Sequence, residues 1–255
     1  MLKNEIQIFY HALMFYSRIP APAKVQFSEE NMTKSLRYFP LVGIIVSLIG
    51  AMFFIGIRYI LPVPLAIVGA ITSIILVTGA FHEDGFADFF DGFGGGTSKE
   101  KILVIMKDSR SGVYGVVSIV LLLLTKFLLL SAMDISQIPL VLVMAHALSR
   151  VTPIWLTATS QYARTDGSSK SQSIGHKPSK ATFFTGMVIG LLPLAFIHNY
   201  LFVPFLLLGM FVIFACYRHY IHKKLGGYTG DVLGALQQFS EIGFYIIYLV
   251  ACKFI

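Results

Sequence analysis

The sequence predicts an all-α, polytopic integral membrane protein with about seven transmembrane helices. Hydrophobic residues make up 56% of the 255 residues, whereas charged residues make up only 13%. The mean hydropathy is +0.74, well above the range of soluble domains of this length. Most apolar residues stand in runs long enough to cross a bilayer as helices. We therefore expect one membrane-embedded domain over residues 1–255.

Residues 1–37 precede the apolar runs and mix polar with hydrophobic residues. Phe9, Leu13, Met14 and Phe15 recur at helical spacing, and the prolines of the stretch 18–22 then stop the helix. We expect an amphipathic helix at the membrane interface, followed by an extended turn. The segment lacks the uninterrupted apolar region of a removable signal peptide, so we expect targeting by the first true span.

Seven apolar runs of spanning length follow this N-terminal segment. They cover residues 38–57, 63–81, 113–133, 138–159, 182–198, 200–217 and 232–251. The fifth and sixth runs are the least distinct, because only Asn199 and its neighbours divide them and both are near the lower length limit.

Lysine and arginine residues are divided unevenly between the two predicted sides. Sixteen of the twenty lie in the N-terminal segment and in the loops of one side. The other side holds Arg58 and Lys253, and Lys126 and Arg150 lie inside runs. Because cytoplasmic loops carry the excess of positive charge, we expect a multi-pass membrane protein whose N-terminus is cytoplasmic. The net charge of +7 therefore reflects the basic loops on one side of the membrane, and no nucleic-acid partner is predicted.

An acidic stretch directly follows the second run, on the predicted cytoplasmic side. Four of the thirteen acids, Glu83, Asp84, Asp88 and Asp91, fall within nine residues. In a helix Asp84, Asp88 and Asp91 are spaced i, i+4, i+7 and share one face. Their repulsion is offset by a hard divalent cation such as Mg²⁺, which prefers oxygen ligands. The sequence therefore predicts a magnesium site at these three aspartates, with Glu83 as a weaker ligand; the alternative is a solvated acidic helix face.

Residues on both sides of the acids are candidates for substrate binding. His82 precedes them and is placed to orient a carboxylate or to transfer a proton. Gly94 and Gly95 follow them in a triple glycine, whose conformational freedom lets a backbone approach phosphate closely, although such a run is more often a hinge.

Asp108 and Arg110 lie just before the third run on the same side. A guanidinium binds two phosphate oxygens at once, so Arg110 is a candidate for catalysis and both residues are candidates for substrate binding. The alternative is a local pair between the two side chains.

Asp231 directly precedes the last run, which contains Glu241 about 15 Å deeper than Asp231, at 1.5 Å per residue. Asp231 is a candidate acceptor for a proton, as are Asp88 and Asp91. An ionisable residue at the depth of Glu241 indicates function. We expect Arg150, in the fourth run, to be its partner, either in substrate binding or as a purely structural pair.

Several kinds of chemistry lack a candidate in this sequence. Cys216 and Cys252 both stand in apolar stretches and are expected to be small buried residues, so no disulfide is predicted. The seven histidines have no metal-ligand spacing, and there is no Walker loop or nucleophile elbow. The residues alone thus predict a Mg²⁺-dependent membrane enzyme that acts on a phosphorylated cytoplasmic substrate. A transporter remains an alternative, although its acids would be expected to spread through the membrane depth.

Five motifs resemble the cobalamin synthase (adenosylcobinamide-GDP ribazoletransferase) family, in order over nearly the whole chain. They are residues 38–43 (YFPLVG), 79–92 (GAFHEDGFADFFDG), 106–110 (MKDSR), 147–150 (ALSR), and 230–235 (GDVLGA) with Ser240 and Glu241. The acidic run alone also resembles the CDP-alcohol phosphotransferases. In that pattern an Arg would follow Ala87, where this chain has Asp88.

The resemblance implies an inner-membrane enzyme that needs Mg²⁺ and has a cytoplasmic active site. It would join adenosylcobinamide-GDP to α-ribazole, or to the 5′-phosphate of α-ribazole, and release GMP. The bilayer is the other expected partner, and the sequence leaves open whether the protein forms a homo-oligomer. The open alternatives in function are a phospholipid enzyme of the CDP-alcohol type and a membrane transporter.

Overall fold

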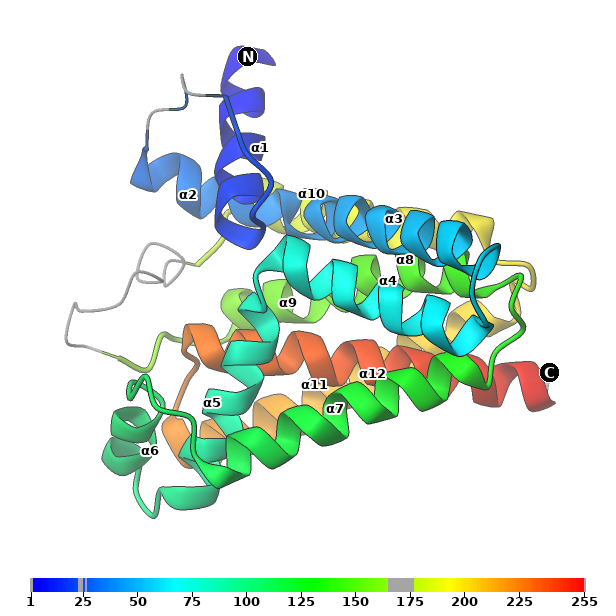
Figure 1. The fold of residues 1–255 in the computed structure, drawn as a ribbon. Helices are drawn as coiled ribbons and strands as arrows, with labels where there is room; N and C mark the ends of the chain where they lie inside the picture. The colour runs from blue at the N-terminus through cyan, green and yellow to red at the C-terminus, as the bar shows by residue number, and fades with distance from the viewer. Residues whose placement is uncertain (1, 23–24, 26, 165–176, 255) are drawn as a thin grey trace.

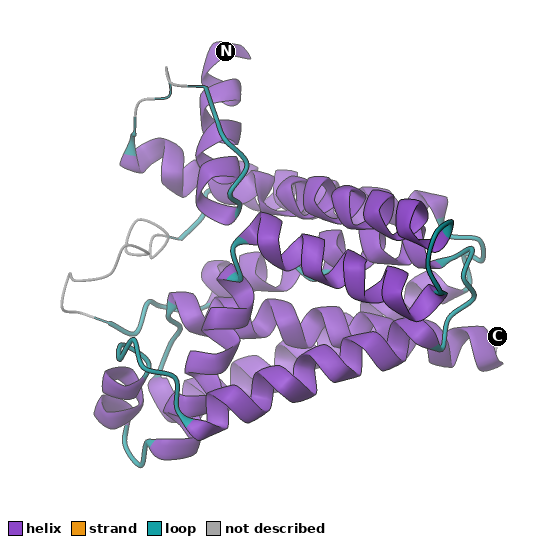
Figure 2. Ribbon diagram, viewed as in Figure 1, coloured by secondary structure: helices purple, strands orange, loops and turns teal. Residues whose placement is uncertain are grey.

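The computed structural model describes residues 2–22, 25, 27–164 and 177–254. Helices dominate it, and the described residues contain a single isolated β-bridge, between Tyr162 and Tyr228 (Figure 2). The helices are α1 (Leu2–Tyr16), α2 (Glu29–Ser35), η1 (Leu36–Tyr38), α3 (Phe39–Arg58), α4 (Val63–Thr78), α5 (Phe81–Gly95), α6 (Lys99–Ile105), α7 (Val113–Ser131), α8 (Ile138–Leu148), α9 (Val151–Thr159), α10 (Lys180–Leu191), η3 (Leu192–Phe196), α11 (Phe202–Leu225) and α12 (Gly230–Phe254). The all-α prediction is confirmed.

The long helices run back and forth along one axis (Figure 1). α3 runs away from the end that carries α1, and α4 returns toward it. The alternation continues with α7, with α8 and α9 together, and then with α10, α11 and α12. All seven predicted apolar runs are therefore helical and alternate in direction. The basic loops gather at the end of the bundle that carries α1, α2 and α6, except that Lys24 and Lys170 lie outside the described residues.

Not every run is long enough to cross a membrane unaided. Five helices of the described chain are long and apolar enough, namely Glu29–Arg58, Val113–Ser131, Ile138–Thr159, Phe202–Leu225 and Gly230–Phe254. α4 has only 16 residues, and the apolar helix Lys180–Phe196 is also shorter. The polytopic class is thus confirmed, whereas spanning by these two shorter segments stays a prediction.

A sharp bend separates α4 from α5. The two helices meet at 88° through Gly79 and Ala80, whose φ angles are +70° and +57°. A left-handed residue caps the C-terminus of a helix but cannot continue it. The second run therefore ends at Thr78, not at residue 81 as predicted, and α5 lies across the basic end of the bundle (Figure 1). α5 is not one of the five helices of the described chain that are by themselves long and apolar enough to cross a membrane.

The fourth run is also interrupted, at Ser149 and Arg150 between α8 and α9. Pro153 has no N–H to donate to the carbonyl of Ser149, four residues earlier. The hydroxyl of Thr152 donates to that carbonyl instead, at 3.1 Å. The break leaves Arg150 in the middle of the packed bundle with no exposed surface.

The N-terminal segment agrees with its predicted outline. α1 ends at Tyr16, and residues 17–22 are irregular, as the prolines require. The side chain of Arg37 pairs with Glu5 at 3.0 Å, which fixes α1 to the start of α3. The position of α1 at a membrane interface stays a prediction.

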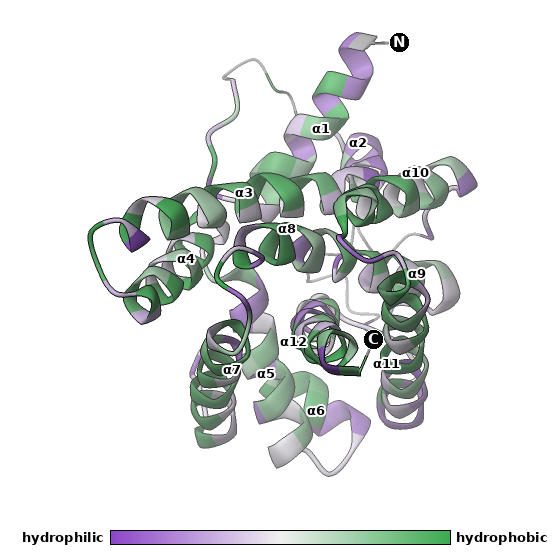
Figure 3. Ribbon diagram, turned by 90° about the vertical axis from the view of Figure 1, so that its right-hand side faces the viewer, coloured by the Kyte–Doolittle hydropathy of each residue, from purple (hydrophilic) through white to green (hydrophobic). Residues whose placement is uncertain are grey.

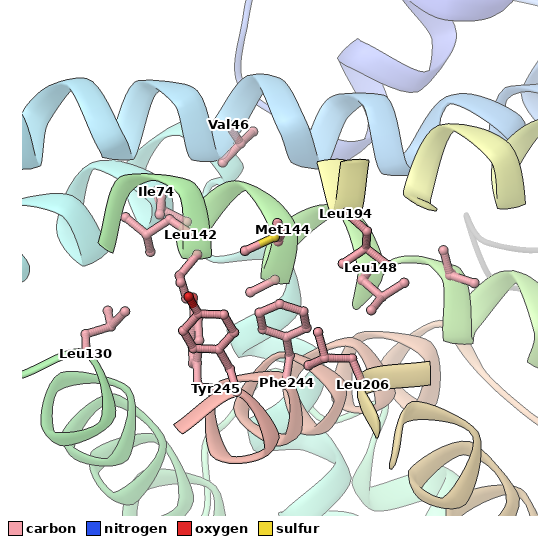
Figure 4. Packing of buried hydrophobic residues seen from close by; sticks show 14 of the residues in the cluster. Val46, Ile74, Leu130, Leu142, Met144, Leu148, Leu194, Leu206, Phe244 and Tyr245 are labelled. Atoms are coloured by element: carbon pink, nitrogen blue, oxygen red, sulfur yellow. The ribbon is translucent and has the colours of Figure 1, made fainter. Parts of the chain in front are cut away.

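The main hydrophobic core lies between α3, α4, α8 and α12. In Figure 4 the rings of Phe244 and Tyr245 project from α12 toward Leu142 and Met144 of α8. The outward faces of the long helices are apolar as well (Figure 3), and large hydrophobic residues such as Val120 and Leu208 are more than half exposed there. Such an outer surface is suited to lipid.

Both cysteines are free, as predicted, but they are exposed. The expectation that Cys216 and Cys252 would be buried is therefore wrong. Each stands in an apolar helix whose outer face is the exposed one, and an apolar run by itself does not tell the lipid-facing side of a helix from the packed side.

Candidate active site

The acidic helix α5 packs directly on the first turn of α12. A side chain at Gly85 would come within 3.1 Å of the Cα atom and the carbonyl oxygen of Asp231. The absence of a side chain at Gly85 lets the two backbones approach closely without such a tight contact. The contact brings Asp231 beside Asp84 and Asp88, which precede and follow Gly85 on α5.

Asp84, Asp88 and Asp231 form an acidic cluster at the basic end of the bundle. Asp84 is exposed and Asp88 is half-buried. Burial raises the pKa of Asp88 to about 7, with further contributions from the charges of Asp231, Asp84 and Asp91. Each neighbouring carboxylate therefore makes ionisation of Asp88 more costly, as the sequence predicted for this stretch.

Arg164 is a member of the site that the sequence analysis did not single out. Its guanidinium lies 3.1 Å from a carboxylate oxygen of Asp231. The backbone before it is anchored to the start of α12, since Ala163 donates to the carbonyl of Tyr228 at 2.8 Å and Tyr228 donates to Gln161 at 3.0 Å. The sequence shows Arg164 only as one basic loop residue among many, and the bridge that places it joins segments far apart in the chain.

Asp91 is held by the N-terminus of α7. Its two carboxylate oxygens accept hydrogen bonds from the backbone N–H groups of Gly112, at 2.7 Å, and Gly115, at 2.8 Å. A carboxylate at this place satisfies N–H groups that lack helical partners and interacts favourably with the helix dipole. Asp91 therefore has a structural role, and its role in metal binding or catalysis stays a prediction.

The glycines after the acids remain helical. α5 continues through Gly95, and the only positive φ angles among the described glycines are at Gly79 and Gly226. A Cβ atom on Gly94 would lie 2.7 Å from the ring of Tyr114. Gly94 and Gly95 therefore do not use the left-handed conformations open to glycine, and Gly94 allows α5 to pack against α7. Phosphate binding by this run stays a prediction.

Asp108 and Arg110 form a local ion pair, which the sequence analysis gave as the alternative to substrate binding. The guanidinium of Arg110 donates to both carboxylate oxygens, at 2.6 Å from its Nη2 atom and 3.0 Å from its Nε atom. These hydrogen bonds lower the pKa of Asp108 to about 2. The side chain of Arg110 is 87% exposed, so it is free to contact a ligand at the basic end.

Beneath the acidic cluster lies a buried charged network. Lys126 of α7 pairs with Glu241 of α12 at 2.9 Å and lies 4.0 Å from Glu83 of α5. Glu83 also accepts a hydrogen bond from Gln238 at 3.1 Å. Glu83 therefore points into the bundle, away from the predicted metal face.

Arg150 does not form the expected ion pair with Glu241. Its Nη1 atom lies 2.7 Å from the carbonyl oxygen and 3.1 Å from the Nδ1 atom of His146, while Lys126 takes the place beside Glu241. The guanidinium also lies 5.3 Å from the ring of Phe39. Arg150 and Glu241 belong to one network but are joined through other side chains.

His82 lies in the first turn of α5, on the inner side of the helix. The side chain is only 3% exposed, and its ring lies 5.5 Å from that of Phe39 and 5.2 Å from that of Phe81. Burial lowers the pKa of His82 well below its ordinary value. His82 therefore lies between the acidic cluster and a group of aromatic side chains.

The acidic cluster offers the right chemistry for a magnesium ion. Its donors are carboxylate oxygens, which this hard cation prefers, and the repulsion that raises the pKa of Asp88 is what a bound cation relieves. Within the described residues, however, no three His, Cys, Asp or Glu side chains are arranged closely enough to hold a metal ion.

The chain is similar to known proteins over nearly its whole length. The family model described as cobalamin-5-phosphate synthase matches residues 8–249. A protein from Shewanella frigidimarina (strain NCIMB 400) is 41% identical over 96% of this chain and 95% of its own length. A protein from Vibrio parahaemolyticus is 37% identical over 99% of this chain and 94% of its own length.

Both relatives are named adenosylcobinamide-GDP ribazoletransferase, as is a protein from Shewanella amazonensis that is 38% identical over 97% of this chain and 96% of its own length. No solved structure matches the chain. The family match over nearly the whole length places this chain in the cobalamin-5-phosphate synthase family of membrane enzymes.

Proposed function

We propose that this protein joins adenosylcobinamide-GDP to α-ribazole, or to the 5′-phosphate of α-ribazole, and releases GMP. The observation that carries the proposal is the acidic cluster of Asp84, Asp88 and Asp231 with Arg164 beside it, in a chain of this family. A carboxylate cluster next to a guanidinium suits phosphoryl transfer, in which little covalent chemistry is left to the protein.

In this reaction a hydroxyl oxygen of the ribazole forms a bond to the phosphorus attached to the cobinamide side. The bond from that phosphorus to the bridging oxygen breaks, and GMP leaves with this oxygen. The hydroxyl proton passes to a carboxylate of the cluster. Asp231 is suited to accept it, because its position at the start of α12 is fixed by the contact with Gly85.

Asp84 and Asp88 are the residues that would hold a Mg²⁺ ion together with the phosphates of the substrate, because no three carboxylates among the described residues are close enough to hold one alone. When bound, the ion supplies positive charge next to the pyrophosphate. Arg164 contributes a fixed positive charge through its contact with Asp231, and the exposed guanidinium of Arg110 is free to bind a phosphate oxygen. Both arginines thus counter the charge that develops on the departing GMP.

The buried charged residues affect the reaction indirectly, by holding the helices that carry the acidic cluster in position. Glu83 joins α5 to α7 and α12, and Glu241 and Arg150 join α12 and α8 to the same network. The network thereby holds α5 in register with the first turn of α12. We place the active site on the cytoplasmic face of the inner membrane, at the end of the bundle that carries the basic loops.

The direct test is an assay of GMP release by the purified protein in detergent. The reaction contains adenosylcobinamide-GDP, α-ribazole and Mg²⁺, and a parallel reaction contains CDP-diacylglycerol. We expect GMP only when both corrinoid and ribazole are present, loss of GMP on adding EDTA, and recovery with excess Mg²⁺. Release of CMP from the lipid donor alone would assign the protein to the phospholipid enzymes instead.

A further inference from the structure

A small cavity with aromatic walls lies beside the acidic cluster. Its volume is about 40 Å³ and its surface is almost entirely apolar. Six aromatic side chains line it, and they come from α1, α3, α5, the segment after α9 and the segment before α12: Phe15, Tyr16, Phe39, Phe81, Tyr162 and Tyr228. Walls of this kind suit a flat aromatic ring.

His82 also lines this cavity, and it is the second feature that indicates a ligand. The side chain is 97% buried, since its exposed fraction is 3%. Neither ring nitrogen has a hydrogen-bond partner among the described residues. A buried polar group without a partner is costly, so a ligand that accepts a hydrogen bond from His82 would be stabilised at this place.

The cavity shares its walls with the reaction site. Gly230 and Gly234 of α12 line it, and Asp231 lies between them. On α5, His82 lies two residues before Asp84, and its backbone packs 3.4 Å from the position of a Cβ atom on Gly234. A ring bound in the cavity would therefore hold an attached sugar next to Asp84 and Asp231.

We propose that this cavity binds the planar benzimidazole base of the ribazole acceptor, with an imidazole N–H of His82 donating to the free ring nitrogen of the base. This inference rests on the proposed function. A benzimidazole nucleoside offers a single acceptor on an otherwise apolar ring, which matches one imidazole among apolar walls. The guanine of the other substrate carries several polar groups on its edge, which would lose water without gaining partners here.

Binding requires the cavity to open, because a cavity that takes up benzene has a volume of about 150 Å³. Phe81 is the lining side chain that can move at the lowest cost, since it is already 40% exposed. It follows the two left-handed residues Gly79 and Ala80, at the bend where α5 begins. The base displaces the Phe81 ring outward and takes its place against Phe15 and Tyr16.

The test compares two ligands on the unmodified protein in detergent. One is α-ribazole, and the other is its indole analogue, in which a C–H replaces the free ring nitrogen. Equilibrium binding of the analogue should be about tenfold weaker, as expected for loss of one hydrogen bond in a buried site. His82→Phe should bind the two ligands equally, whereas His82→Gln, which keeps a donor, should restore a preference for ribazole.

A kinetic measurement tests the aromatic walls. Phe15→Ala removes one wall, and loss of a stacked ring should raise the KM for α-ribazole about tenfold. The KM for adenosylcobinamide-GDP should stay unchanged. Phe184→Ala is the matched control, because Phe184 is 63% exposed on α10 and does not line the cavity.

Three results decide the inference. Equal binding of α-ribazole and its indole analogue by the unmodified protein would overturn it, and so would a Phe15→Ala variant in which only the KM for adenosylcobinamide-GDP changes. Preferential binding of α-ribazole, lost in His82→Phe, together with no GMP release under any condition, would support the cavity and overturn the proposed function instead.

Discussion

At the scale of single residues, Lys126 holds together the charged groups inside the bundle. Its side chain is 5% exposed and lies between Glu241, at 2.9 Å, and Glu83, at 4.0 Å. Buried charges are tolerated when they are paired. With Arg150 nearby, the network contains two acids and two bases, so its formal charge is balanced.

Replacing Lys126 should therefore destabilise the protein strongly. Lys126→Met leaves Glu241 and Glu83 without this cation, and loss of one partner of a buried pair costs about 3 to 5 kcal/mol. Thermal unfolding in detergent measures the effect. Lys99→Met, on the exposed helix α6, is the control and should have little effect.

The double variant Lys126→Met/Glu241→Gln gives the sharper comparison, because it removes a charge of each sign. Its loss of stability should be smaller than the sum of the two single losses. Additive losses would show that the two side chains do not act as a pair.

Sequence reasoning found most of the chemically important residues but did not pair them correctly. Glu241 was expected to be functional because of its depth, whereas its partner was expected to be Arg150. Both Lys126 and Arg150 stand alone in apolar runs, and nothing in the runs themselves tells which one faces α12. Arg164 was missed for a similar reason, since its place depends on the bridge between Tyr162 and Tyr228.

At the scale of elements, the relation between α5 and α7 depends on Asp91. Both of its carboxylate oxygens accept hydrogen bonds from backbone N–H groups at the start of α7. Asp91→Ala should cost about 1 to 2 kcal/mol of stability, as for loss of a helix cap. Asp91→Asn keeps one acceptor and should lose less.

The matched control for Asp91 is Asp84→Ala, in the same helix. Asp84 is exposed, so its removal should leave the unfolding temperature nearly unchanged while turnover falls. Equal stability of Asp91→Ala and Asp84→Ala would contradict the structural role of Asp91.

The elements themselves were largely predictable, and their breaks were not. The sequence analysis assumed a helix over the acidic stretch when it put the three aspartates on one face, and α5 confirms that helix. The 88° bend before it depends on a left-handed Ala80, a conformation that alanine rarely adopts and that no local pattern indicates. Because of this bend α5 packs on both α7 and α12. Asp91 therefore contacts the start of α7, whereas Asp231 of α12 lies beside the other aspartates of α5.

At the scale of the whole molecule, the long helices alternate in direction (Figure 1), so the basic loops of the described residues gather at one end of the bundle. This arrangement follows from apolar length and from the division of lysine and arginine residues, and both could be read from the sequence. The acidic cluster lies at the basic end. Its three carboxylates come from two helices that are far apart in the chain, so the full set required the fold.

The orientation in the membrane can be tested by cysteine labelling. With Cys216 and Cys252 replaced by alanine, Thr97→Cys tests the basic end and Ile135→Cys tests the other; both native residues are exposed. A membrane-impermeant maleimide applied to intact spheroplasts should label only Ile135→Cys, as the positive-inside rule requires. Labelling of Thr97→Cys alone would reverse the proposed orientation.

The central claim is that the acidic cluster carries the transfer, and the activity of Asp88→Asn tests it most directly. The variant removes one charge from the half-buried centre of the cluster while keeping its shape. GMP release should fall at least about 100-fold, with normal membrane insertion and an unchanged unfolding temperature. Asp134→Asn, in the exposed loop after α7, should retain full activity. Near-normal turnover by a well-folded Asp88→Asn protein would contradict the account.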